Sequence, residues 1–368
     1  MKKIVYLMEY PIDLPGGAQL STEMIAAALS ACPGYGYEPV VICPELLNRS
    51  ASDYPFRILT YSMGEKRFPN LLKRIKAFKN YIAAEKPDLI HIEMSESLIT
   101  YGFIQGAFKG IRHIYTDRGM LFGYRKRSRF FMNPVLKKAS CIITTTDKNR
   151  ELWSNNTSFG PVYTIPNTIS LLFEDYDEGK KKQGGRLSVG FAGRICVEKD
   201  WGKVPLIVRE LEANGPDFEI RLVLSLYEKG DRAFADGLRK EIEDIIGADR
   251  LYYREDLTQE EMSDFYYGTD LFIMTSVFES FGKAAVEAMS RRCCVMSTDV
   301  GGLPEVIGRK ENLYSMEDLS KLTDYARKLT KDAEFLKMEQ EYFYNRYHER
   351  YTSDSYVKRH LEVYDRFT

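Results

Sequence analysis

Short apolar runs alternate with segments of helical periodicity along the whole chain. In the first half, these runs predict buried strands at 3–8, 38–43, 57–60, 88–92, 112–116, 141–145 and 162–165. Between them, apolar positions recur at helical spacing, for example over 18–31 and 71–84. Buried strands that alternate with helices are typical of parallel sheets covered by helices.

The alternation stops at a charged, glycine-containing segment and then starts again. Further strands are predicted at 187–192, 219–225, 250–253, 271–275 and 293–297. The sequence therefore predicts an α/β protein with two Rossmann-like, doubly wound domains that face each other across a cleft. We expect the first domain at 1–170, a linker at 171–186 and the second domain at 187–351. Aromatic and charged residues alternate at helical spacing over 342–368, and we expect a helix at 352–368 to complete the first domain.

The composition is that of a folded globular protein. The chain has 368 residues, of which 44% are hydrophobic and 29% are charged, and this length favours two domains. No apolar run reaches the length of a membrane span, and the run after Lys2 and Lys3 ends at Glu9, too early for a signal peptide. The six cysteines form no CxxC pair. We therefore expect reduced thiols, no metal site and a cytoplasmic protein.

Charge is distributed unevenly along the chain. Lys and Arg outnumber Asp and Glu in residues 1–182, whereas the reverse holds for the remainder. An anionic partner is thus expected at the first half, although two unrelated solvated surfaces would give the same counts. Nucleic acid is not expected, because the whole chain is slightly acidic and contains no recognition motif.

Two glycines follow the first predicted strand. Gly16 and Gly17 come directly before a helix, where the backbone can approach a ligand and free amides favour an anion. A plain turn and helix cap is an equally good interpretation. The pattern is not GxGxxG, so a nicotinamide or flavin site is not indicated.

Two cations follow the first strand of the second half. Arg194 comes after Gly193 at the strand end, and Lys199 lies five residues later. A planar guanidinium and a compact ammonium above the carboxyl edge of a sheet suit two neighbouring phosphates. Taken singly, each could be an ordinary surface charge.

Two glutamates flank a helix start after the strand at 271–275. Glu279 lies in the loop, Phe281, Gly282 and Lys283 offer backbone amides, and Glu287 lies just over a turn into the helix. Carboxylates accept strong hydrogen bonds from vicinal hydroxyls, so one could bind a sugar ring and the other a ribose.

The ordered set of motifs resembles the family-4 retaining glycosyltransferases with the GT-B fold, also called glycosyl transferases group 1. Glu279 and Glu287 match the E-x7-E motif of that family, and the segment 297–305 is similar to its next loop. Gly193-Arg194 with Lys199 resembles its diphosphate-binding pair. The segments 165–167 and 270–273 and the Gly16-Gly17 turn match in order, so the resemblance covers nearly the whole chain.

The resemblance implies a site and a reaction. Arg194 and Lys199 would hold the diphosphate of a nucleotide sugar, and Glu287 would hold its ribose. Glu279 and the amides of Phe281, Gly282 and Lys283 would bind the transferred sugar, with Gly16 and Gly17 opposite. A UDP-sugar is the first candidate donor and a GDP-sugar the second. The family transfers the sugar with retention, and no metal or other cofactor is expected.

The first domain departs from the family pattern. Where many members carry a histidine before an aspartate, this chain has Thr116 before Asp117 and Arg118. We interpret Asp117 and Arg118 as candidates for orienting the acceptor, or else as a salt-bridged loop. His91 occupies the position of a common family histidine, but a lone histidine at a strand end is also typical of a structural role.

The acceptor is expected to be a saccharide or a lipid-linked saccharide. Four cations and several aromatic residues interleave over 124–131, and basic residues flank the apolar face of the helix at 71–84. Such surfaces can sit on anionic lipid, so peripheral contact with the inner membrane face is one interpretation. Core packing with a solvated basic edge is the alternative.

Three other functions remain open from the sequence. A glycoside hydrolase could use Glu279 and Glu287 as its paired carboxylates, although Arg194 and Lys199 would then have no task. An epimerase of sugar nucleotides could use the same fold. A non-catalytic subunit that binds a sugar nucleotide is the third alternative.

Overall fold

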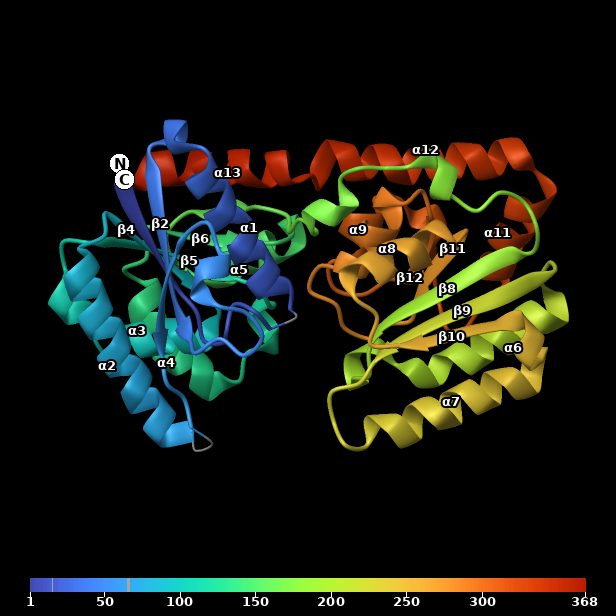
Figure 1. Ribbon diagram of the computed structural model, residues 1–368, viewed down its shortest axis with the longest axis horizontal. Coiled ribbons are helices and arrows are strands. Elements are labelled where there is room, and N and C mark those ends of the chain that lie inside the picture. The colour runs from blue at the N-terminus through green and yellow to red at the C-terminus, as the bar shows by residue number, and fades with distance from the viewer. Residues whose placement is uncertain (15, 65–66) are drawn as a thin grey trace. The chain divides into compact units, whose positions relative to one another are not determined.

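The computed structural model describes residues 1–14, 16–64 and 67–368. Contacts divide the chain into two units, and each has its own sheet. Met1–Thr168 and Ser353–Thr368 form the first unit, whereas Ile169–Thr352 form the second. Figure 1 shows both units as sheets flanked by helices.

The first unit contains a parallel sheet with the strand order β3-β2-β1-β4-β5-β6-β7. From β1, the chain first adds β2 and β3 on one side and then adds β4 to β7 on the other side. The direction of winding therefore reverses between β1 and β4. Ligands of such sheets bind beyond the strand ends at this reversal. The strands are β1 (Lys2–Leu7), β2 (Tyr37–Pro44), β3 (Arg57–Tyr61), β4 (Leu89–Glu93), β5 (Arg112–Asp117), β6 (Cys141–Thr144) and β7 (Val162–Thr164).

Helices bury both faces of the first sheet. Along β1, Ile4 and Tyr6 enter one apolar core while Val5 and Leu7 enter the other, as the two-residue period of a strand requires. This explains why the strands read as continuous apolar runs. The helices are α1 (Gly17–Ala31), α2 (Arg67–Glu85), α3 (Ser95–Gly102), α4 (Lys126–Leu136), α5 (Asp147–Asn156) and α13 (Ser353–Phe367).

The second unit repeats this design with the strand order β10-β9-β8-β11-β12-β13. Its strands are parallel, and the winding reverses between β8 and β11. The strands are β8 (Leu187–Arg194), β9 (Phe218–Ser225), β10 (Leu251–Glu255), β11 (Leu271–Met274), β12 (Cys294–Thr298) and β13 (Leu313–Tyr314). Their helices are α6 (Val204–Asn214), α7 (Asp231–Ile246), α8 (Gln259–Tyr267), α9 (Lys283–Ser290), α10 (Leu303–Ile307), α11 (Ser320–Lys331) and α12 (Ala333–Arg350).

The strands predicted from the apolar pattern are present, with ends that differ by one or two residues. The two-residue strand β13 was not predicted, because it is too short to show a pattern. The aromatic and charged stretch at 342–368 is divided between two helices, α12 in the second unit and α13 in the first.

The segment predicted as a linker, 171–186, packs on the second unit. Phe173 is fully buried in the apolar core of that unit. The buried Arg291 guanidinium donates to the backbone carbonyls of Leu172 and Phe173, at 2.5 and 2.9 Å, and to the Ser263 hydroxyl at 2.8 Å. Because these bonds hold the segment, the second unit already begins at Ile169.

The helix α13 covers one face of the first sheet. Tyr356, Val357 and Tyr364 belong to the same apolar core as Ile4 and Tyr6. The hydroxyls of Tyr6 and Tyr364 are hydrogen-bonded at 2.9 Å. Residues at the two ends of the chain therefore share one core, and Figure 1 shows the two termini side by side.

We predict that Arg291→Ala lowers the free energy of unfolding by about 2–4 kcal/mol, because the buried Ser263 hydroxyl and Phe173 carbonyl and the part-buried Leu172 carbonyl lose a charged donor. Urea unfolding followed by circular dichroism measures this. Arg209→Ala is the control, since it removes only an exposed ion pair with Glu241 and should change stability by less than about 1 kcal/mol. Equal losses in the two variants would contradict the anchoring role of Arg291.

Candidate active site

The predicted donor residues of the second unit lie where the winding of its sheet reverses. Arg194 ends β8, Glu279 follows β11, and these two strands are neighbours. The chain forms α6, β9, α7, β10 and α8 between these two strands, so the sheet brings together residues that are far apart in sequence. This edge is the expected position of a ligand in such a sheet.

The end of β8 is fixed by its backbone. Gly193 has a φ of +152°, which L side chains rarely adopt. The Trp201 indole donates to the Arg194 carbonyl at 2.8 Å. These features fix the backbone of Arg194, while its side chain is exposed.

Lys199 and Glu279 form an ion pair. The distance from Lys199 Nζ to Glu279 Oε2 is 2.6 Å, and the side chains are 21% and 18% exposed. The Thr275 hydroxyl donates to the Lys199 carbonyl at 2.6 Å, and the Val277 amide donates to the Glu198 carbonyl at 2.9 Å. The two loops are therefore joined by backbone contacts as well as by charge, so the pair is preorganised.

A small pocket lies beside this ion pair. Its lining comes from the ends of β8 and β11 and the loops after them: Phe191, Ala192, Lys199, Trp201, Ile273, Met274, Thr275 and Ser276. Among the described residues, the buried Ser276 hydroxyl has no hydrogen-bond partner. A buried polar atom without a partner is costly and indicates a position that a ligand or water fills.

The loop that carries Glu279 rests on a second loop. The Gly302 amide donates to the Glu279 carbonyl at 2.9 Å. Gly301 has a φ of +53°, and a Cβ atom there would overlap the same carbonyl oxygen. Glycine is thus required at residue 301 both for its backbone conformation and for this close approach. Through this contact, the segment 297–305 supports the loop that carries Glu279.

Glu287 lies on α9, which begins at Lys283 with Gly282 as its N-cap. The buried Tyr266 hydroxyl donates to Glu287 Oε2 at 3.1 Å. Burial raises the pKa of Glu287, whereas the charges of Lys283 and Lys199 and the Tyr266 hydrogen bond oppose that rise. Lys199 therefore acts on both glutamates, and the structure brings these three predicted residues together.

In the first unit, Gly16 and Gly17 lie at the start of α1, beyond the end of β1. Gly17 is the first residue of the helix, and Gly16 is extended with a φ of −178°. They lie where the winding of the first sheet reverses. Their role toward a phosphate stays a prediction.

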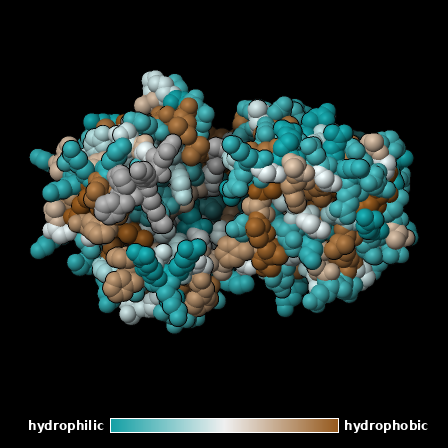
Figure 2. All heavy atoms as spheres, turned by 90° about the horizontal axis from the view of Figure 1, so that it is seen from below, coloured by the Kyte–Doolittle hydropathy of each residue, from teal (hydrophilic) through white to brown (hydrophobic). Residues whose placement is uncertain are grey.

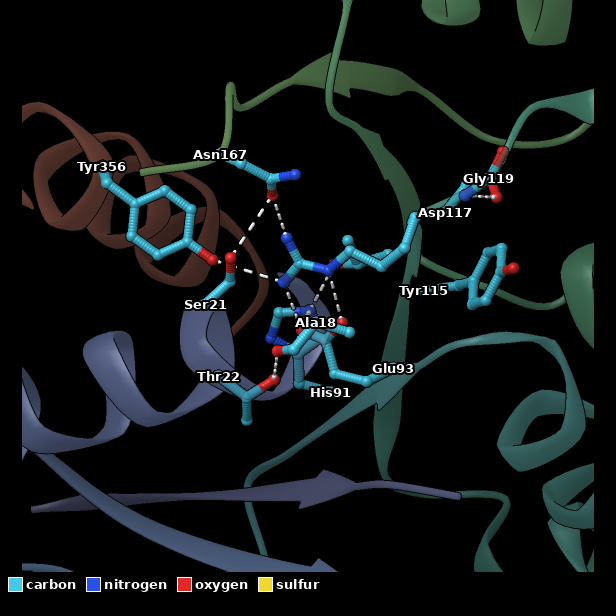
Figure 3. A network of polar contacts seen from close by, with 12 residues as sticks. Ala18, Ser21, Thr22, His91, Glu93, Tyr115, Asp117, Gly119, Asn167 and Tyr356 are labelled. Atoms are coloured by element: carbon cyan, nitrogen blue, oxygen red, sulfur yellow. Dashed lines mark hydrogen bonds and ion pairs between the residues drawn. The ribbon is translucent and has the colours of Figure 1, made fainter. Parts of the chain in front are cut away.

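Arg118 belongs to a buried polar network, which Figure 3 shows around His91, Glu93, Asn167 and Tyr356. Its guanidinium donates twice to the Glu93 carboxylate, at 2.9 Å each, and to Asn167 Oδ1 at 2.5 Å. It also donates to the Tyr356 hydroxyl at 3.3 Å. Glu93 and Tyr356 were not identified from the sequence, because they come from different elements distant along the chain.

Asp117 is fully buried and accepts hydrogen bonds from protein groups. Its donors include the Tyr124 hydroxyl, the Asn149 side-chain amide at 2.9 Å and the Trp153 indole at 2.7 Å. Each carboxylate oxygen therefore has a protein partner, as a buried charge requires. The Asp117 side chain holds β5 to α5 and to the segment before α4.

His91 is also fully buried. Its ring nitrogens lie 2.8 Å from the Tyr364 hydroxyl and 2.6 Å from the Thr116 hydroxyl. Burial lowers the pKa of His91, and the nearby Arg118 charge lowers it further, so the ring is neutral at physiological pH. The contacts of His91 and Arg118 favour the structural alternatives for these residues, and an acceptor role for them stays a prediction.

Solved structures share this fold over the full chain. Sucrose-phosphate synthase of Thermosynechococcus elongatus is 17% identical with a TM-score of 0.81, and the match covers 100% of this chain and 99% of that one. HepE of Anabaena in complex with UDP-glucose is 16% identical with a TM-score of 0.78, over 99% and 100%. The two units thus have the architecture of the GT-B glycosyltransferases.

Sequence comparison gives the family. The model described as Glycosyltransferase Family 4 matches residues 15–171, and the model described as Glycosyl transferases group 1 matches residues 173–346. The two matches follow one another along nearly the whole chain. The chain belongs to the family-4 glycosyltransferases, as the motifs indicated.

Curated relatives match a part of the chain. The phosphatidylinositol N-acetylglucosaminyltransferase GPI3 subunit of Saccharomyces cerevisiae is 23% identical over 283 residues, which cover 71% of this chain and 60% of the relative. The gpi3 subunit of Schizosaccharomyces pombe is 24% identical over 309 residues, covering 82% and 66%. The chain therefore matches about three fifths to two thirds of the length of these relatives.

We predict that Gly301→Ala destabilises the protein by about 1–3 kcal/mol and loosens the Glu279 loop, because the new methyl group meets the Glu279 carbonyl at a positive φ. Gly237→Ala is the control. Nothing lies within 4 Å of a Cβ at residue 237 in α7, so alanine there should add about 0.5–1 kcal/mol. Chemical unfolding and hydrogen exchange at 276–283 measure both effects. A stable Gly301→Ala with unchanged exchange would contradict this account.

Proposed function

We propose that this protein transfers a sugar from a nucleoside-diphosphate sugar to an acceptor hydroxyl, with retention of anomeric configuration and without a metal ion. The observation that carries the proposal is the cluster of Lys199, Glu279 and Glu287 at the reversal of the second sheet, beside the exposed Arg194. Two cations suit a diphosphate, and two carboxylates suit hydroxyl groups.

Each group has a task in this proposal. Arg194 and Lys199 bind the diphosphate and stabilise the charge that develops on it as the bond to the anomeric carbon breaks. Glu287 accepts hydrogen bonds from the ribose hydroxyls. Glu279, with the amides of Phe281, Gly282 and Lys283, binds the transferred sugar. The Ser276 hydroxyl offers a further bond in the pocket beside Lys199.

The proposed retaining mechanism is a front-face displacement, in which no protein nucleophile is expected. The departing diphosphate oxygen takes the proton of the acceptor hydroxyl while that hydroxyl oxygen attacks the same face of the sugar. The protein then contributes position and electrostatic stabilisation. A glycoside hydrolase would use Glu279 and Glu287 but would leave Arg194 and Lys199 without a task.

A UDP-sugar is the first candidate donor and a GDP-sugar the second. Support for UDP comes from HepE of Anabaena, whose solved structures contain UDP-glucose or UDP. A thermal-shift panel of UDP, GDP and their sugars tests the proposal. A ligand at a hundred times its Kd should stabilise the protein by about 2.7 kcal/mol. Turnover of a nucleotide sugar without any acceptor would instead indicate an epimerase, and binding without turnover a non-catalytic subunit.

We propose a lipid-linked or other saccharide acceptor, presented at an anionic membrane surface. The cations Arg125, Lys126 and Arg127 are exposed at the start of α4. Phe130 is 72% exposed, and its ring lies 5.5 Å from that of Phe131. Aromatic side chains beside cations suit the boundary of a charged lipid layer. The name of the yeast relative, which specifies phosphatidylinositol, also supports a lipid acceptor.

The charges are essential to this docking. In Figure 2, brown and teal side chains are interspersed over the coloured part of the visible face of the first unit. Within the described residues, no helix is long and apolar enough to span a membrane. Attraction between the cations and anionic headgroups would therefore supply much of the binding.

We predict that Lys199→Ala lowers turnover by about 10²–10³, the range for losing one preorganised donor to a developing charge. It should also lose the thermal shift with UDP, because the diphosphate loses a cation. Lys203→Ala, four residues along the same loop, is the matched control and should retain both. The assay measures release of nucleoside diphosphate from the donor identified in the panel. Unchanged turnover in Lys199→Ala would refute the role of Lys199.

We predict that the full-length protein floats with anionic vesicles of phosphatidylglycerol and phosphatidylcholine, and not with phosphatidylcholine alone. The double variant Lys126→Glu with Arg127→Glu should bind about tenfold or more weakly, since each basic residue contributes about 1 kcal/mol near headgroups. Lys328→Glu with Lys331→Glu, at exposed positions of α11, makes the same change in charge and should bind like the natural protein. Equal recovery with the two kinds of vesicle would contradict the docking.

A further inference from the structure

The chain passes between its two units at two places. The first lies between Thr168 and Ile169, and the second lies between Thr352 and Ser353. The second passage separates the helices α12 and α13. The contacts of the residues before and after this passage determine how freely its backbone dihedral angles can change.

Tyr351 is the last buried residue before the second passage. It is 2% exposed, and its amide donates to the Tyr347 carbonyl at 2.8 Å at the end of α12. Its ring contacts the ring of Phe281 edge to face, with centroids 5.7 Å apart and planes at 80°. Aromatic pairs favour this geometry because the positive ring edge meets the negative face.

Phe281 belongs to the loop that the proposed function assigns to the donor sugar. It lies between Glu279 and Gly282 and is itself buried. The loop therefore rests, through the Phe281 ring, on the residue that ends α12. If Phe281 served only to fill the core, the aromatic residue that it contacts would not need to lie beside a passage between the units. That residue, Tyr351, does lie there.

The same end of α12 also holds the helix that follows Gly301 and Gly302. The Arg346 guanidinium donates to the carbonyls of Glu305 and Val306, at 2.5 and 2.7 Å. The Tyr351 hydroxyl lies 3.5 Å from the Val306 carbonyl. Because Gly302 in turn supports Glu279, two independent routes connect the Glu279 loop to the last two turns of α12.

The other side of the passage is firmly held within the first unit. Tyr356, in the first turn of α13, is buried and accepts a hydrogen bond from Arg118 at 3.3 Å. Arg118 is paired with the buried Glu93. The segment 352–355, which includes the first residues of α13, therefore lies between two buried tyrosines, Tyr351 and Tyr356.

We propose that Tyr351 is a positioning residue that couples occupation of the Glu279–Lys283 loop to the backbone at 352–355. The proposal rests on the proposed function only in assuming that this loop takes the diphosphate side of a nucleotide donor. A bound diphosphate fixes the loop amides and holds Phe281 against Tyr351. The tyrosine ring then restricts the end of α12 and the passage that follows.

Hydrogen exchange on the full chain, with and without UDP, tests the coupling after calorimetry has given the Kd of UDP. We expect UDP to slow exchange in 279–283 and also in 352–355, the latter by about fivefold, the lower end of measured couplings between sites. Slower exchange in 279–283 with no change in 352–355 would overturn the coupling and leave the proposed function intact. Failure of both UDP and GDP to bind would overturn both.

Variants separate the ring contact from general packing. Tyr351→Phe keeps the ring and should keep the response at 352–355. Tyr351→Leu should lose it while binding UDP with a Kd within about twofold, because the ring does not reach the ligand. Phe343→Leu removes another buried ring from α12 and should keep the response. Loss of the response in Phe343→Leu as well would overturn the specific role of Tyr351. If Tyr351→Leu does not fold, the natural protein and Tyr351→Phe still decide the question.

Discussion

The ion pair between Lys199 and Glu279 is the interaction on which the site of the second unit depends. It joins loops that leave the neighbouring strands β8 and β11, and a hydroxyl and an amide fix the same loops to each other. The positions of both charges are thus determined by folding, before any ligand arrives. A site with fixed charges loses little freedom on binding, which is the condition for strong electrostatic stabilisation of a developing charge.

The sequence predicted the strands well, but not the partners of the candidate site residues. Strands buried on both faces read as apolar runs, and Arg194, Lys199 and Glu279 each follow such a run. The contact between Lys199 and Glu279 depends on β11 lying beside β8, and local pattern contains no information about strand order. The helix expected at 352–368 is α13, although neither glycine nor proline marks its start at Tyr351 and Thr352.

The first unit shows the same limit more strongly. Arg118 was interpreted either as a candidate for orienting the acceptor or as part of a salt-bridged loop, and its guanidinium is paired with Glu93, Asn167 and Tyr356. These partners lie on three segments that are remote in the sequence. Burial also removes some of the counted positive charges from the surface. The guanidinium groups of Arg74 and Arg118 lie among hydrogen-bonding partners inside the unit. The exposed cations include Arg125, Lys126 and Arg127. The positive surface is therefore smaller than the composition suggests.

The helix α13 has a consequence for folding during synthesis. Tyr356, Val357 and Tyr364 complete the core beneath β1, so the first unit lacks part of its interior until α13 has left the ribosome. The second unit is one continuous segment, 169–352, and emerges complete before them. Domains usually mature in the order in which they are translated. In this protein the unit that is made first cannot complete its core until α13 has been made, and the second unit can reach its final packing earlier.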